Sequence, residues 1–235
     1  MKKKLALKTA YILTILATLT LATLGSKAVA VFSQGSDFVR EHCFIIDAGH
    51  GGPDGGATSC SGVRESDINL AISLKLRDLM HFLGYQTRMV RTEDISVYTE
   101  GETIAGMKMS DLKERVRICN ETSGAILLSI HQNTFPDTRY SGAQVFHSPT
   151  EGSKALAQSL QETFIRTLNP GSRRAVKESE GVYLMEHIRC PGVLIECGFI
   201  SHPEEEVRLR SPNYQRDLCC VIASCAATYI ADSAT

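Results

Sequence analysis

The chain has 235 residues, of which 43% are hydrophobic and 22% are charged. This length and composition suit one domain with a sizeable buried core, and they exclude a largely disordered protein. The formal net charge of −1 gives no general attraction to nucleic acid or to anionic lipid, so we expect no nucleic-acid partner.

The N-terminus has the pattern of an export signal. A basic stretch at residues 2–4 leads to an uncharged, apolar run at residues 9–24. This run is close in length to a signal-peptide core and is short for a bilayer span. Ala28 and Ala30 then supply the small-x-small pattern that signal peptidase recognises. The same residues would also serve an uncleaved signal anchor, so both interpretations stay open.

These features define the expected organisation of the chain. We predict a signal peptide or signal anchor at residues 1–30, a linker at residues 31–41 and a catalytic domain at residues 42–235. With either kind of signal the domain is exported and extracytoplasmic, and it meets the membrane only through its N-terminal segment.

Short apolar runs alternate along the domain with segments of helical periodicity. The predicted strands are residues 43–47, 85–90, 125–130, 142–146 and 192–195; the predicted helices are residues 67–83, 111–120, 153–168, a short segment that opens at Pro203, and residues 212–230. The strands are continuous apolar runs, which is typical of parallel strands buried on both faces. The pattern predicts an α/β fold with a mostly parallel twisted sheet, flanked by helices on both faces, in a single domain.

Two further features are less regular. Residues 94–110 contain two glycines and no clear period, so we predict a surface loop there, with Ser110 capping the helix that follows. Several of the eight cysteines fall on strands or on apolar helix positions. We interpret most of them as small core hydrophobes; one or two disulfides stay open as an alternative, and we assign none.

Three polar side chains follow three different predicted strands. His50, His131 and Glu196 each come just after an apolar run, and ligands of parallel sheets bind beyond the carboxyl ends of the strands. Glu65 lies at the start of the helix over residues 67–83, from which it can reach back over the strand ends. Taken singly, such a histidine is more often structural, and Glu65 is more often a helix N-terminal acid. Only the set indicates a site.

A hydrolytic zinc ion suits this set. It takes three nitrogen or oxygen ligands from the protein and keeps one position open for water. The imidazoles of His50 and His131 with one carboxylate leave a positive site that acidifies the water. A carboxylate that does not bind the metal is needed as a base, and Glu196, behind an apolar strand, fits because burial raises a carboxyl pKa.

Four segments resemble the motifs of the zinc-dependent N-acetylmuramoyl-L-alanine amidases of type 3. They are I-D-A-G-H-G-G-P-D-G-G-A at 46–57, E-S-D-I-N-L at 65–70, S-I-H-Q-N at 129–133 and L-I-E-C-G-F-I-S-H at 194–202. The resemblance spans residues 43–231. Ser66 stands where the family usually has lysine, and His202 stands where it usually has asparagine.

The resemblance implies a zinc cofactor held by His50, Glu65 and His131, with Glu196 as the catalytic residue. It also implies a peptidoglycan substrate, cut at the amide between N-acetylmuramic acid and L-alanine by a zinc-activated water. Residues 140–146 and 183–185 resemble the germination-specific branch, which removes stem peptides so that muramic-δ-lactam forms in the spore cortex. The protein is then expected in the cell wall, or anchored in the membrane and facing the wall.

Several alternatives stay open. The chain could be another peptidoglycan metallohydrolase, such as a stem-peptide peptidase, or a non-catalytic wall-binding protein; the presence of all four site residues argues against the latter. An activating protein partner is a further option. Other histidines compete as site residues: His42, His81, His147, His187 and His202. A basic cluster of Arg173, Arg174 and Lys177 is by default a solvated loop, with contact to stem-peptide carboxylates as the alternative.

Overall fold

Six strands form one sheet in the computed structural model, which describes residues 41–137 and 139–233. The strands are β1 (Cys43–Ala48), β2 (Gln86–Met89), β3 (Ala125–Asn133), β4 (Gln144–His147), β5 (Lys177–Glu178) and β6 (Gly192–Phe199), and they lie in the order β2-β1-β3-β6-β4-β5. β2, β1, β3 and β6 run parallel, whereas β4 is antiparallel to β6 and parallel to β5. The prediction of a mostly parallel sheet is confirmed, with a reversed pair at one edge.

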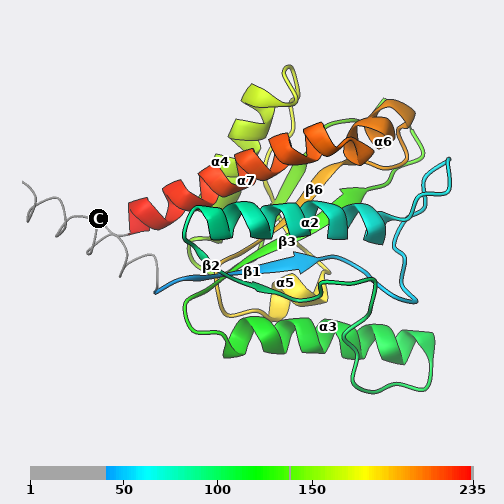
Figure 1. The fold of residues 1–235 in the computed structure, drawn as a ribbon, viewed down its shortest axis with the longest axis vertical. Helices are drawn as coiled ribbons and strands as arrows, with labels where there is room; N and C mark the ends of the chain where they lie inside the picture. Colours follow the sequence, from blue (N-terminus) through cyan, green and yellow to red (C-terminus); the bar gives the residue numbers. More distant parts are fainter. Residues whose placement is uncertain (1–40, 138, 234–235) are drawn as a thin grey trace, which may run out of the picture. The chain divides into compact units, whose positions relative to one another are not determined.

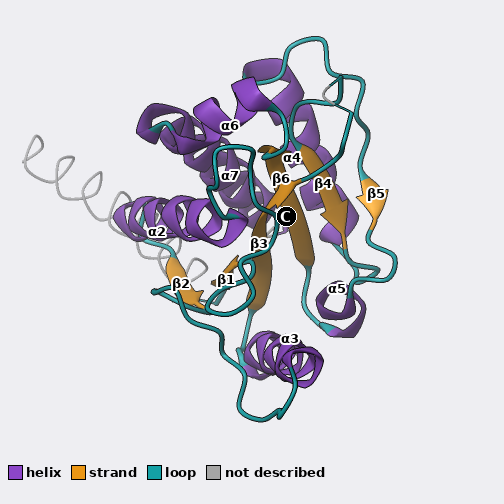
Figure 2. Cartoon of the chain, turned by 90° about the vertical axis from the view of Figure 1, so that its right-hand side faces the viewer, coloured by secondary structure: helices purple, strands orange, loops and turns teal. Residues whose placement is uncertain are grey.

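Helices cover both faces of the sheet, as predicted. They are α2 (Glu65–Phe82), α3 (Ile104–Glu121), α4 (Ser153–Thr167), α5 (Tyr183–His187), α6 (Pro203–Arg210) and α7 (Pro212–Ser233). α2, α4, α6 and α7 pack together on one face, and α3 and α5 lie on the other (Figures 1 and 2). None of the helices in residues 41–137 and 139–233 has the length and hydropathy of a membrane span. The predicted export signal at residues 1–30 lies outside the described residues, as does the predicted linker except for Glu41.

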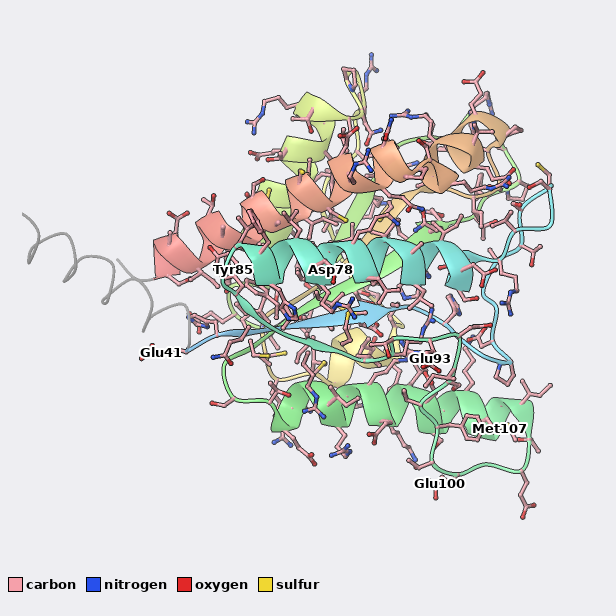
Figure 3. All side chains as sticks on the ribbon, viewed as in Figure 1. Glu41, Asp78, Tyr85, Glu93, Glu100 and Met107 are labelled. Atoms are coloured by element: carbon pink, nitrogen blue, oxygen red, sulfur yellow. The ribbon has the colours of Figure 1, made fainter. Side chains whose placement is uncertain are left out.

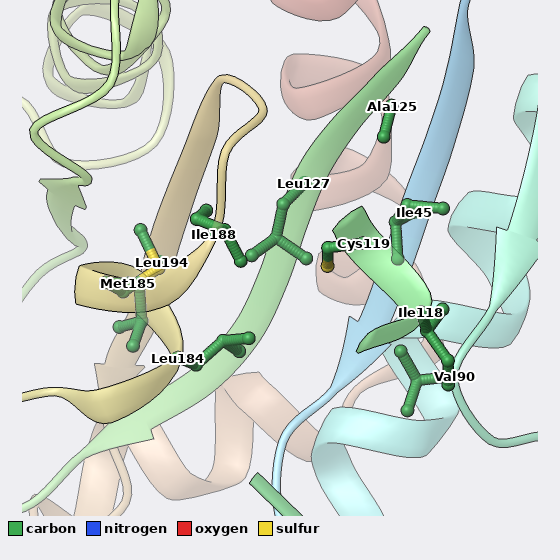
Figure 4. Close-up of a cluster of buried hydrophobic side chains, with 10 residues drawn as sticks. All are labelled: Ile45, Val90, Ile118, Cys119, Ala125, Leu127, Leu184, Met185, Ile188 and Leu194. Carbon is green, nitrogen blue, oxygen red and sulfur yellow. The ribbon is translucent and has the colours of Figure 1, made fainter. Parts of the chain in front are cut away.

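Alternation along the central strands sends apolar side chains to both faces. On the α3 and α5 face, Ile45, Leu127 and Leu194 belong to one buried cluster with Cys119 of α3 and Met185 of α5 (Figure 4). Four of the eight cysteines are buried, two are half-buried and two are exposed, so the core role predicted for most of them holds for half. The two apolar faces hold the parallel strands rigidly, so their carboxyl ends share one edge of the sheet.

The segment before α3 differs from the prediction. The helix begins at Ile104 instead of Asp111, and the side chain of Thr103 caps it by accepting the N–H of Gly106 at 3.1 Å. Its first turns carry exposed apolar residues, including Ile104 and Met109, so they show no amphipathic period. Ser110 caps nothing; its hydroxyl accepts the N–H groups of Thr99 and Glu100 and ties the preceding loop to the helix.

β3 and β6 continue further than predicted. His131 and Glu196 therefore lie within these strands, as partners in the parallel ladder, and not just past the strand ends. The prediction ended both strands too early because polar residues at their ends break the apolar pattern. The hydrogen bonds of the ladder are made by the backbone and continue whether the side chains are apolar or polar. The short elements β5 and α5 were not predicted, because two and five residues are too few to show a period.

A buried ion-pair network joins α3 to the carboxyl end of β1. Arg115 pairs with Asp47 and Asp111, and both Arg115 and Asp47 are almost fully buried. Burial alone would raise the pKa of Asp47, but the Arg115 guanidinium and the Ser129 hydroxyl hold that pKa below its usual range. The same guanidinium donates to the carbonyl of Ala48 at 3.1 Å, so the network also fixes the start of the loop after β1.

Replacing Arg115 with methionine should destabilise the fold strongly. The change leaves Asp47 buried without its cation, which costs about 3–5 kcal/mol of unfolding free energy. Urea denaturation measures this loss. The control is Arg117→Met on the same helix, whose ion pairs with Glu114 and Glu121 are exposed and should contribute little. Equal losses in the two variants would contradict the role given to Arg115.

Candidate metal centre and active site

His50 lies in the loop after β1, in a backbone conformation that side chains rarely adopt. Its φ of 61° is the one positive value at a non-glycine residue in the described part of the chain. Two buried arginines hold this bend: Arg115 donates to the carbonyl of His50 at 2.9 Å, and Arg91 donates to the carbonyls of Ala48 at 2.8 Å and Gly49 at 3.1 Å. The bend turns the imidazole back over the edge of the sheet.

His131 approaches this loop across the ladder between β1 and β3. A Cβ atom at Gly49 would lie 2.2 Å from His131 Nε2, so a residue with a side chain cannot occupy position 49 without moving the ring. The two imidazole centroids lie 5.0 Å apart. Glycine at position 49 is therefore what allows His50 and His131 to reach one site.

Glu65 is the first residue of α2, and its carboxylate is buried between the two histidines. Oε1 lies 3.0 Å from His131 Nδ1, and Oε2 lies 3.3 Å from His50 Nε2. Burial would raise the pKa of Glu65, but the hydrogen bonds from His131 and His50 outweigh it and lower that pKa far below its usual range. The backbone N–H groups of Ala57 and Gln132 also donate to this carboxylate. Glu65 is thus held ionised.

These three side chains fit a divalent metal ion. One donor atom from each of His50, Glu65 and His131 lies within 4.8 Å of the others, and no other cluster of this kind occurs in residues 41–137 and 139–233. The separations of 3.0 Å between Glu65 and His131 and of 3.3 Å between Glu65 and His50 lie near the edge of about 3.4 Å expected for a tetrahedron with zinc–ligand bonds of about 2.1 Å. Two imidazoles and one carboxylate form a donor set that hydrolytic zinc sites use.

Glu196 faces the same cleft from β6, beside His131 in the ladder. The residue is partly exposed, but its Oε2 atom is buried and has no hydrogen-bond partner among the described residues. Burial raises the pKa of Glu196 to about 7, and the Glu65 carboxylate contributes to this rise while His131 and His50 oppose it. A carboxylate with a pKa near neutrality and a free oxygen can take a proton from water and give it back.

Two residues that support the candidate metal ligands were missed from the sequence. Asp54 Oδ2 lies 3.0 Å from His50 Nδ1, the ring nitrogen opposite to the one that faces Glu65, and so orients that imidazole. Asn69 donates to Glu65 Oε1 at 3.2 Å and to the carbonyl of Gly49 at 3.1 Å. Both stand inside the motif segments, and the spacing of Glu65 and Asn69, one helical turn, was the available signal.

The competing histidines are engaged elsewhere. His81 contacts Thr87, His147 lies 2.9 Å from the carbonyl of Ser148, and His187 lies 2.8 Å from the carbonyl of Tyr183. His202 Nδ1 accepts the N–H groups of Glu204 and Glu205 and so caps α6. This capping role explains how histidine can replace asparagine, a common capping residue, at position 202.

The four residues line a cleft of about 450 Å³ at the carboxyl edge of the sheet. Its floor is formed by β3 and β6, and its walls are formed by the loop after β1 and by the start of α2. The start of α3, where Figure 3 labels Met107, lies at the same end of the molecule, and Lys108 from this turn also lines the cleft. The candidate metal centre is therefore accessible from solvent.

Comparison with known proteins gives concordant similarities. A family model described as N-acetylmuramoyl-L-alanine amidase matches residues 44–226. The germination-specific N-acetylmuramoyl-L-alanine amidase of Bacillus subtilis is 36% identical over 172 residues, which cover 72% of each chain. The CwlD amidase of Clostridioides difficile, solved in complex with the GerS lipoprotein, is also 36% identical, with a TM-score of 0.77 over 81% of this chain and 98% of that chain. An N-acetylmuramoyl-L-alanine amidase of Clostridium difficile 630 has a TM-score of 0.71 at 29% identity, over 80% and 96% of the two chains.

Adding one methyl group at Gly49 should weaken metal binding. In Gly49→Ala the new Cβ displaces the His131 ring, and we expect the affinity for zinc to fall about 10- to 100-fold, as when a ligand loses its orientation. Competition with a chromophoric chelator measures the affinity. Gly106→Ala is the matched control, because its Cβ would meet Thr103 and no imidazole. Unchanged affinity in Gly49→Ala would exclude this positioning role.

Proposed function

The chain belongs to the N-acetylmuramoyl-L-alanine amidase family of hydrolases, and from that premise we propose that it cuts peptidoglycan with a zinc ion held by His50, Glu65 and His131. The amide that joins N-acetylmuramic acid to L-alanine is the proposed target. The observation that carries this proposal is the convergence of the three donor side chains beside the unpartnered oxygen of Glu196.

The residues of the chain divide the reaction between them. A zinc ion bound there would act as a Lewis acid that polarises the scissile carbonyl and acidifies water. Glu196 takes the proton from the attacking water, which its pKa near 7 permits at neutral pH. The same carboxyl group then passes the proton to the nitrogen of L-alanine, so that the amine leaves in neutral form. Asp54 and Asn69 keep His50 and Glu65 in the orientation that the site needs.

A stem-peptide peptidase would use the same ligands and the same base. The two activities differ in the bond that is placed next to Glu196, and so in their products. Amidase action releases a peptide with a free L-alanine amino group and leaves a lactyl carboxylate on the sugar, whereas a peptidase cuts within the stem.

We also propose where the protein acts. A peptidoglycan substrate lies outside the cytoplasm, which supports export through residues 1–30. The 36% identity to the germination-specific amidase supports a role in the spore cortex, where removal of stem peptides would precede the formation of muramic-δ-lactam. The GerS lipoprotein bound to CwlD suggests a protein partner for this chain as well. The rate of the purified chain alone on wall fragments decides whether a partner is required.

Glu196→Gln should separate metal binding from hydrolysis. The amide of glutamine cannot accept a proton, so we expect the rate on wall fragments to fall at least about 100-fold, the scale of general base catalysis. Zinc content should stay at the wild-type value, because this residue is outside the ligand set. His131→Ala is the complementary variant and should lose zinc. Wild-type activity in Glu196→Gln would contradict the proposed mechanism.

Mass spectrometry of digested wall fragments should identify the bond that is cut. We expect free stem peptides that begin with L-alanine, and we expect a zinc chelator to abolish them and added zinc to restore them. Products cut within the stem would favour the peptidase. The same measurement on spore cortex from a strain that lacks the gene should show loss of muramic-δ-lactam; normal lactam content would refute the cortex role.

A further inference from the structure

A second hollow opens from Glu196 on the side away from the metal ligands. Its volume is about 570 Å³, and its floor is formed by Leu194 of β6 and Phe146 of β4. Glu196 also lines the cleft that holds His50, Glu65 and His131. This one carboxylate therefore stands between the two hollows, so a substrate cut beside Glu196 would extend one half into each of them.

Strand register places Lys177 along the second hollow. Lys177 of β5 pairs with Phe146, and Phe146 pairs with Leu194, so the three residues lie side by side across three strands. Lys177 is thus two strands away from β6. Along the strand direction it lies at the height of Leu194, which precedes Glu196 by two residues. Strand spacings of about 4.8 Å and a rise of about 3.3 Å per residue put the Cα atoms of Lys177 and Glu196 about 12 Å apart.

Arg173, Arg174 and Lys177 form what we call the basic shelf. Together they line a third hollow of about 840 Å³, which shares Lys177 with the second. Arg173 and Lys177 make no ion pair with any residue in the described ranges. Arg174 is fixed in place by hydrogen bonds to the carbonyl of Ser141 at 3.0 Å and to Gln144 Oε1 at 3.1 Å, and it stacks on Phe199. The shelf therefore offers unpaired positive charge next to a rigid guanidinium.

Acidic groups near the shelf do not neutralise the end closest to Glu196. Glu178 and Glu180 follow Lys177 in the direction that leads away from the level of Glu196, because β5 runs antiparallel to β6. Glu205 is committed to the N–H groups of Gly142 and Phe199. Glu204 is exposed and lines the rim of the third hollow. Lys177 is thus the basic residue of the shelf that lines the hollow opening from Glu196, and Arg173 and Arg174 line the adjoining third hollow.

We propose that the basic shelf binds a carboxylate of the stem peptide on the leaving-group side of the scissile amide. This inference rests on the proposed amidase function and names the part of the substrate that the second hollow receives. The acidic second residue of the stem carries an α-carboxylate about two residues, or about 7 Å of extended chain, from the scissile bond. The remaining distance of about 5 Å is within reach of the four-carbon side chain of Lys177.

Two muropeptides that differ in one group test the proposal. One carries the free α-carboxylate on the second stem residue, and the other carries the carboxamide at the same position. We expect the zinc-loaded wild-type chain to favour the carboxylate in kcat/KM by about threefold to tenfold, the range of a partly exposed charge-assisted contact. The double variant Arg173→Gln/Lys177→Gln should lose this preference.

A charge removed elsewhere provides the control. Lys154→Gln, on the exposed side of α4 and outside both hollows, should keep the full preference for the carboxylate. Equal kcat/KM of the wild type for the two muropeptides, or an unchanged preference in the double variant, would overturn the role of the basic shelf and leave the amidase function intact. Failure of the wild type to cut either muropeptide would overturn the proposed function and this inference with it.

Discussion

The parallel pairing of β1, β3 and β6 is the constraint on which the active site depends. In this register Ala48 lies opposite Ile130 and His131 lies opposite Glu196, so residues far apart in the chain come to one edge. Each strand is locked by apolar side chains on both faces, and a slip by one residue would turn every one of them to the wrong face. The positions of His131 and Glu196 are therefore as rigid as the core itself.

The loop after β1 needs a different kind of support, because in the described part of the chain its backbone bond to β3 is a single one, from the N–H of Gly49 to the carbonyl of Ile130. Arg91 and Arg115 support the loop through hydrogen bonds to three consecutive carbonyl groups, at positions 48–50. Guanidinium groups suit this task because they present several donors in a fixed plane. Arg91 also donates to the carbonyl of Ser66, next to Glu65, so one side chain ties the His50 loop to the start of α2.

Much of this arrangement could be predicted from the sequence. Continuous apolar runs indicated the five longer strands, and the residues that follow them indicated His50, His131 and Glu196. Glu65 became a firm expectation only through the family resemblance, since its contact with both histidines depends on how α2 meets the sheet. The helical spacing of Glu65 and Asn69 was a signal in the sequence, but the contacts of Asp54 with His50 and of Asn69 with Gly49 depend on the bend at His50, which is a property of the tertiary structure.

Other features escaped because local patterns do not encode them. The first turns of α3 project Ile104 into solvent, and a helix without a buried stripe has no periodic signature. β5 is only two residues long, yet it sets the position of Lys177 relative to the floor of the second hollow. In the sequence, the basic cluster looks like an ordinary solvated loop. Its position relative to Glu196 is set only by the pairing of β5 with β4 and of β4 with β6.

The buried, unpartnered oxygen of Glu196 lowers the stability of the folded chain. A carboxylate without a partner in a poorly solvated place destabilises the native state, and an apolar or amide side chain there would relieve it. If Glu196 is the proposed base, selection for a more stable chain would therefore favour its loss. Screens for thermostable variants of this protein should accordingly enrich inactive substitutions at position 196, unless activity is selected at the same time.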